Sequence, residues 1–134
     1  ANTAQETVTR MINPPMNVPP IMLTGLDLII IQARLHVNGK TARKITEVAE
    51  IAGMEGSKPR LNTIWKYNAH TDQIEETGIP SNLREVICRA AGVTPDVFEK
   101  HVSQREAILQ DMISRDVSDI QRVTKLIQSF YASR

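Results

Sequence analysis

The sequence predicts an α+β fold, in which strands and helices occupy separate stretches of the chain. Apolar residues follow a helical period in residues 2–12, change to the shorter period of strands in residues 26–77, and return to a helical period from residue 79 onward. This order predicts a short helix, a largely antiparallel sheet of three or four strands, and a helical subdomain of three helices. We place the boundary between the two parts at residues 1–79 and 80–134.

The first helix is expected over residues 2–12, because Thr3 and Glu6 have the spacing of a capping box. Asn13-Pro14-Pro15 should end it, since a proline forces its predecessor out of the helical region. A proline-rich loop follows, and one helical turn should begin at Pro20.

The strand region is organised around Asn38-Gly39, a strong signal for a two-residue hairpin turn. Because the flanking segments are apolar or alternating, residues 26–37 should pair antiparallel with residues 41–51. Residues 53–60 contain two glycines and a proline and are expected to be a loop. After this loop we predict a third strand at 61–67, a polar turn N-A-H-T-D, and a fourth strand at 73–77.

The helical part shows three start signals. Ser81 should cap a helix that Gly92 ends, Thr94-Pro95-Asp96 should start a second helix, and Asp116 should cap the last. The last two helices are expected to form an antiparallel pair. The apolar side chains predicted to be buried in this part are Leu83, Val86, Ile87, Phe98, Leu109, Met112, Ile120, Val123 and Ile127.

The composition limits the function classes. Lysine plus arginine is 16 and aspartate plus glutamate is 15, and this balance argues against a general nucleic-acid binder. Cys88 is the single cysteine, which excludes an internal disulfide and a cysteine-based zinc cage. The amino end lacks the features of a signal peptide, and the longest near-apolar run, residues 26–31, is too short to span a membrane.

Two motifs suggest chemistry but have simpler interpretations. V-N-G-K-T at residues 37–41 ends like a phosphate-binding loop, but Arg34 stands where the first glycine is required, so a hairpin is the better interpretation. Residues 83–102 have the spacing of a helix-turn-helix. A DNA-binding module with a β-hairpin arm is therefore our alternative function, although Asp96 and Glu99 would repel phosphates at the start of its recognition helix.

The segments with the most specific pattern lie elsewhere. The start A-N-T-A-Q-E-T-V-T-R-M-I-N-P-P-M-N-V-P resembles the stretch just after the histidine box of secretion ATPases, the motors of type II and type IV secretion, type IV pili and archaeal archaella. G-L-D-L-I-I-I-Q at 25–32 and R-K-I-T-E-V-A-E-I at 43–51 continue the resemblance. R-E-A-I-L-Q-D-M-I and I-Q-S-F-Y near the carboxyl end resemble the archaeal members.

The resemblance implies the carboxyl-terminal part of a P-loop ATPase, beginning just after the histidine box and comprising the last strands of a RecA-like domain and a helical subdomain. The family's phosphate-binding loop, Walker B segment and histidine box all lie upstream. The parent protein is therefore expected to bind ATP and magnesium, whereas this chain alone should be inactive and hold no cofactor or metal.

The same resemblance implies a role in protein transport: a hexamer that couples ATP hydrolysis to protein export or filament assembly. The implied partners are the other subunits of the homohexamer and a platform protein of the inner membrane, with no nucleic acid. The implied location is cytoplasmic, peripherally associated with the cytoplasmic membrane.

Three residues can be carried over from the family. Arg10 matches an arginine near the nucleotide and the neighbouring subunit, which implies such a contact; a solvated helix arginine is an equally good interpretation. Arg43 and Glu47 match an R-x-x-T-E pattern, which implies an ion pair across strands or at a subunit interface. For this pair we favour the structural role, and we expect no catalytic residue in the chain.

Overall fold

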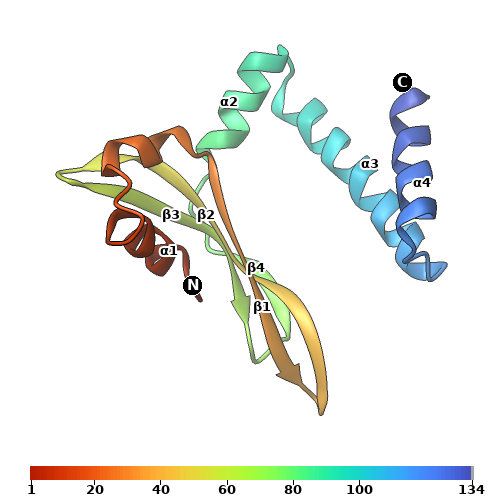
Figure 1. Ribbon diagram of the computed structural model, residues 1–134. Coiled ribbons are helices and arrows are strands. Elements are labelled where there is room, and N and C mark those ends of the chain that lie inside the picture. The colour runs from red at the N-terminus through yellow and green to blue at the C-terminus, as the bar shows by residue number, and fades with distance from the viewer. Residues whose placement is uncertain (134) are drawn as a thin grey trace. The chain divides into compact units, whose positions relative to one another are not determined.

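The structure, a computed structural model, describes residues 1–133. It contains one four-stranded antiparallel sheet and several helices, which confirms the expected α+β class (Figure 1). The chain divides into two compact units, Ala1–Val86 and the residues from Ile87 onward. In chain order the elements are α1 (Ala4–Ile12), the 3-10 helix η1 (Pro20–Gly25), β1 (Leu28–Val37), β2 (Lys40–Glu55), β3 (Lys58–Asn68), β4 (Gln73–Glu76), α2 (Asn82–Ala91), α3 (Pro95–Ser114) and α4 (Ile120–Ala132).

The sheet has the order β1-β2-β3-β4, so each strand pairs with its neighbour in the sequence. The first hairpin closes with Val37 opposite Lys40. Asn38 and Gly39 between them have φ angles of 50° and 74°, the positive values that a type I′ turn requires. The predicted two-residue hairpin is therefore confirmed.

The prediction of a loop over residues 53–60 is wrong, because β2 and β3 both continue through this region and are joined by a short turn. Glu55 lies opposite Lys58, and only Gly56 and Ser57 form the turn. Gly56 has a φ of 60° at the first central position, as type II′ turns require. Gly53 has a φ of 95° inside an irregularity of the strand pairing, so this glycine marks a bulge rather than a loop.

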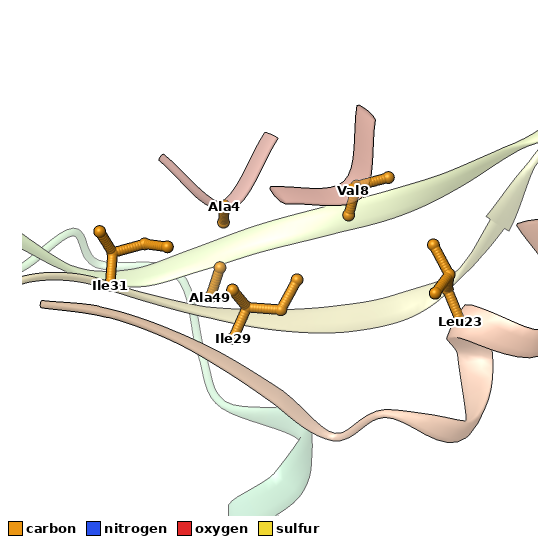
Figure 2. Close-up of a cluster of buried hydrophobic side chains, with 6 residues drawn as sticks. All are labelled: Ala4, Val8, Leu23, Ile29, Ile31 and Ala49. Atoms are coloured by element: carbon orange, nitrogen blue, oxygen red, sulfur yellow. The ribbon is translucent and has the colours of Figure 1, made fainter. Parts of the chain in front are cut away.

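Helix α1 packs on one face of the sheet. Ala4 and Val8 point from this helix toward the strands, where they meet Ile29, Ile31 and Ala49 (Figure 2). Leu23 of η1 completes this cluster and is 1% exposed. Burial of these side chains on one face is the main apolar contribution to the stability of the first unit.

The start of α1 follows the predicted capping signal with one change. The Thr3 hydroxyl accepts the Glu6 amide hydrogen at 3.0 Å, as a capping residue should. The Glu6 carboxylate accepts from the amide of Asn2 at 2.7 Å, whereas a capping box would place it on the amide of Thr3. The helix ends at Ile12, before the two prolines, as expected.

The opposite face of the sheet holds a buried acid, Glu50, which is 3% exposed. It alternates with Ala49 on β2 and therefore faces away from the α1 side. Its carboxylate accepts hydrogen bonds from the Ser81 hydroxyl and from the Asn82 amide, the latter at 2.8 Å. Ser81 also accepts from the amide of Arg84 at 3.1 Å, so the predicted serine cap of α2 is confirmed.

In the second unit, Thr94 caps α3 as predicted, accepting from the amide of Val97 at 3.4 Å. The cap predicted for the last helix is wrong: Asp119 caps α4, with its carboxylate 2.9 Å from the Arg122 amide. Asp116 instead adopts a φ of 51° just after α3. Aspartate tolerates this left-handed conformation, so Asp116 ends one helix rather than starting the next.

The predicted burial of apolar residues in the helices is largely wrong. Met112 is 4% exposed, as expected, but Val86, Leu109 and Ile120 are 53%, 56% and 77% exposed. The α3 residues do share one face, as their helical spacing requires, but within residues 1–133 that face is largely uncovered. Of the remaining residues predicted to be buried, Ile87 and Ile127 are exposed and Leu83, Phe98 and Val123 are intermediate.

Candidate functional site

The junction between α1 and β2 joins residues 1–18 to residues 43–51, the two segments on which the expected family resemblance mainly rests. The Glu47 carboxylate accepts the amide hydrogen of Ala4 at 2.8 Å and the hydroxyl hydrogen of Thr63 at 2.9 Å. A carboxylate at a helix N-terminus satisfies an amide that lacks a partner within the helix and interacts favourably with the helix dipole. Glu47 therefore fixes the start of α1 on the sheet. We call this contact the α1–β2 junction.

The structure spreads the three sequence-predicted site residues rather than gathering them. Arg10 lies exposed in the last turn of α1, six residues beyond Ala4 and so roughly 9 Å along the helix axis. Arg43 lies exposed on β2 opposite Arg34, four residues from Glu47 and so about 13 Å along the strand. The Glu47 carboxylate accepts from an amide and a hydroxyl, and both donors lie within the first unit.

The G-K-T sequence at residues 39–41 lies on the β1–β2 hairpin. Gly39 forms the turn, and Lys40 and Thr41 are the first residues of β2. A phosphate-binding loop leads from a strand into a helix whose amides surround the phosphates. Here the amides continue into a strand, so the hairpin interpretation is confirmed.

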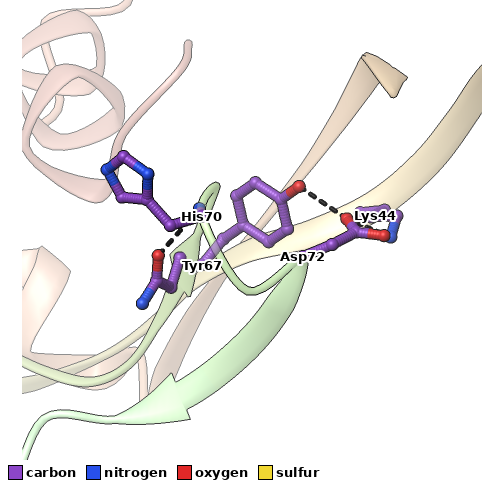
Figure 3. Close-up of polar contacts among 5 residues, drawn as sticks. Lys44, Tyr67, His70 and Asp72 are labelled. Atoms are coloured by element: carbon purple, nitrogen blue, oxygen red, sulfur yellow. Dashed lines mark hydrogen bonds and ion pairs between the residues drawn. The ribbon is translucent and has the colours of Figure 1, made fainter. Parts of the chain in front are cut away.

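A polar cluster lies at the β3–β4 turn, at the same end of the sheet as the β1–β2 hairpin (Figure 3). Asp72 follows β3 in the left-handed conformation, with a φ of 57°. Its carboxylate accepts from the Lys44 ammonium at 2.5 Å and from the Tyr67 hydroxyl at 2.7 Å. The hydrogen bond from Lys44, with that from Tyr67, lowers the pKa of Asp72, and the hydrogen bond to Asp72 raises the pKa of Tyr67.

This cluster was missed by the sequence interpretation, which treated N-A-H-T-D only as a polar turn. In the same turn the backbone amide of His70 donates to the Asn68 side chain at 2.9 Å, which makes it a compact Asx-type turn. Within the cluster, the ammonium of Lys44 and the hydroxyl of Tyr67 both donate to the Asp72 carboxylate. We assign it to holding the β3–β4 turn against β2.

Residues 1–133 hold one free thiol and no cluster of metal-binding side chains. Across residues 1–133, His, Cys, Asp and Glu side chains nowhere gather in a group of three that could hold a metal ion. Cys88 is a buried free thiol on α2. Among the same residues, no helix combines the length and apolarity needed to cross a membrane.

The alternative DNA-binding module corresponds to α2, α3 and the turn that joins them. Gly92 in this turn has a φ of 64°, and the amide of Val93 donates to the carbonyl of Cys88 at 3.0 Å. α3 carries exposed acids, Asp96 and Glu99, in its first turns. Tight turns of this kind join many packed helices, so DNA binding remains an untested prediction.

The relatives described here come from one archaeon. No protein-family model matches the chain. The chain is 35% identical over 132 residues to the uncharacterized protein MJ0781 of Methanocaldococcus jannaschii, covering 97% of this chain and 18% of that protein. It is 27% identical over 138 residues to MJ0900 of the same organism, covering 98% of this chain and 25% of the relative, and 28% identical over 114 residues to MJ1287, covering 84% and 42%. The chain thus spans less than half the length of each of these relatives.

Proposed function

We propose that this chain is the carboxyl-terminal part of a hexameric secretion, pilus or archaellum ATPase, which couples ATP hydrolysis to protein export or filament assembly. The observation that carries the proposal is the α1–β2 junction. The two segments with the most specific resemblance, residues 1–18 and 43–51, are far apart in sequence but are joined by the Glu47–Ala4 hydrogen bond and by packing of Ala4 and Val8 with Ala49. Residues that resemble one family therefore form one piece of structure.

Two further observations support the proposal. The chain matches 18% of the length of MJ0781 and 25% of the length of MJ0900, as expected for one part of a larger machine. The first unit also leaves large apolar side chains exposed, among them Ile30 at 56% and Met22 at 67%. Apolar surfaces of this kind in a folded unit commonly mark contacts with other parts of an assembly.

In this proposal the chain has a mechanical rather than a chemical role. Phosphoryl transfer needs a phosphate-binding loop, a magnesium-holding acid and a positioned water. The parent protein supplies these upstream and binds ATP and magnesium there, while Arg10 is the residue of this chain that the family resemblance assigns to a contact with the nucleotide or a neighbouring subunit. The machine works in the cytoplasm at the inner face of the membrane, with a membrane platform protein as partner.

The test uses the full-length protein that contains this sequence. Its coding sequence should contain a phosphate-binding loop and an H-A-N junction that overlaps Ala1, and the purified protein should hydrolyse ATP with magnesium and form hexamers. Replacing the lysine of the phosphate-binding loop by alanine is the control and should abolish turnover. An upstream sequence without these motifs, or a full-length protein without ATPase activity, would refute the proposal.

A further inference from the structure

The second unit contains an apolar groove between the end of α2 and the start of α3. It has a volume of about 380 Å³. Ile87, Val102 and their neighbours remain substantially exposed, at 40% and 43% for these two. The apolar residues that line the groove are Ile87, Ala91, Val93, Phe98 and Val102. We call this feature the α2–α3 groove.

Beyond the exposed Glu106, further apolar side chains lie along the same face of α3. Val102, Leu109 and Ile113 are spaced by seven and four residues and so lie on one face of the helix. Leu109 and Ile113 are 56% and 72% exposed, whereas Met112 on the neighbouring face is 4% exposed. The groove and this stripe together have the shape that an amphipathic helix with anchors at i, i+3, i+4 and i+7 recognises.

The polar side chains that line the groove are Arg105 and His101, and Arg105 supplies its positive charge. None of the seven lining residues carries a carboxylate. The Arg105 guanidinium donates to the His101 carbonyl at 2.8 Å and lies 5.7 Å and 5.6 Å from the ring centroids of Phe130 and Tyr131. These contacts hold the charge in place but do not neutralise it, and one hydrogen bond leaves most of the five N–H donors of the group for other acceptors.

We propose that the α2–α3 groove binds an acidic amphipathic helix from a partner protein, with apolar side chains in the groove and a carboxylate on Arg105. An apolar floor beside one fixed guanidinium matches a helix that presents leucine-like anchors with glutamate or aspartate next to them. A basic helix with the same apolar face would place its charges against Arg105. Charge complementarity therefore sets the partner's sign, while the apolar area supplies most of the affinity.

The experiment measures fluorescence anisotropy of two labelled synthetic helices of about five turns, roughly 18 residues. Both carry the same leucine face, one with glutamates and one with lysines on the polar face. The acidic helix should bind this chain with a Kd of about 10 to 100 μM. It should bind at least about fivefold more tightly than the basic helix, the upper range of one exposed ion pair, and the difference should shrink at high salt.

Matched variants locate the binding site. Val102→Glu places a repelling charge in the groove and should weaken the acidic helix about tenfold or more, a loss of about 1.4 kcal/mol. Val97→Glu is the control, because Val97 is 39% exposed on the same helix but does not line the groove. Arg105→Gln should bring the two helices to similar affinity. Equal binding of both helices by the unchanged chain, binding weaker than about 1 mM, or equal damage by Val97→Glu would each overturn the proposal.

Discussion

The Glu50 carboxylate of β2 accepts the amide hydrogen of Asn82, the first residue of α2, at 2.8 Å. The two residues are 32 positions apart, and the acid is almost fully buried. A strand thus supplies the capping carboxylate of a helix, together with the helix's own Ser81. This arrangement satisfies a buried acid and the first amides of α2 at once.

Glu50→Gln should therefore destabilise the first unit by about 1 to 3 kcal/mol, because the neutral amide loses the charge-assisted bonds and turns an N–H group toward other donors. Amides of the first turn of α2 should also exchange faster with solvent. Trp65 on β3 reports unfolding of this unit by its fluorescence in urea. Glu55→Gln, an exposed acid on the same strand, is the control and should change stability by less than about 0.5 kcal/mol.

Gly39→Val should destabilise the first unit by about 1 to 3 kcal/mol, since it forces a β-branched residue to a positive φ. Space is not the cause, because no heavy atom lies within 4 Å of the position a Cβ would take. Gly25→Ala is the matched control: it is equally open but lacks a positive φ. A Gly39→Val variant with the urea midpoint of the parent would contradict the type I′ turn.

Met112→Ala should cost about 2 to 5 kcal/mol, the range for truncating a buried side chain of this size. Leu109→Ala, three residues earlier and 56% exposed, should cost less than about 1 kcal/mol. Helical circular dichroism during thermal unfolding measures both, because the second unit consists of helices. Similar losses for the two variants would mean that another surface covers Leu109 in solution.

Local signals in the sequence predicted much of this structure. Thr94, Ser81 and Asn38-Gly39 act through bonds and φ angles within a few residues, and each takes the predicted role. The wrong predictions concern choices that neighbours do not decide. Gly53 is compatible with a loop or a bulge, and the pairing of β2 with β3 selects the bulge.

The candidate site was harder to predict for the same reason. In the sequence Glu50 has no feature that distinguishes it from other strand acids, because its partner in α2 is distant along the chain. Lys44 likewise comes close to Asp72 only when the strands pair. The sequence indicated which face of α3 is apolar, through Leu109 and its neighbours, but not whether anything covers it. Coverage depends on which surfaces pack on the helix, and periodicity does not encode that.

The stability of the first unit should fall in acid through Asp72. Its pKa in the folded state is lowered by the Lys44 and Tyr67 hydrogen bonds, so its contribution is fully present above the unfolded value of about 3.9 and is lost as the pH falls through the folded value. The Asp72→Asn variant should lose this part of the pH dependence of the urea midpoint. Part should remain, because hydrogen bonds from Thr71 and Asn68 lower the pKa of Glu75 as well.

At high pH the same cluster should also lose stability, in this case through deprotonation of Tyr67. The hydrogen bond to Asp72 raises the pKa of Tyr67 in the folded state above its ordinary value near 10. The stability from this contact is present below that value and is lost as the pH rises through the folded pKa. Tyr67→Phe should abolish this alkaline loss. If the urea midpoints of the unchanged chain and of the Tyr67→Phe variant fell equally at high pH, the assignment would be contradicted.

The final prediction concerns ATP. This chain alone should bind magnesium-ATP no more tightly than about 1 mM by isothermal titration, because micromolar affinity needs about 8 kcal/mol and a single exposed arginine contact supplies at most about 1 kcal/mol. The G-K-T sequence adds nothing, since Gly39 forms a hairpin turn and Lys40 begins a strand. Micromolar binding would show that a nucleotide site lies within these residues.

Arg10 gives the complementary test in the full-length protein. If it completes a nucleotide pocket, Arg10→Ala should lower turnover by about 10- to 1000-fold, as for other lost transition-state donors. Folding should be unchanged, because Arg10 is exposed in the last turn of α1. Arg89→Ala is the matched control, an exposed arginine in the last turn of α2. Normal turnover of the Arg10→Ala variant, or an equal loss for Arg89→Ala, would return Arg10 to the role of a solvated helix charge.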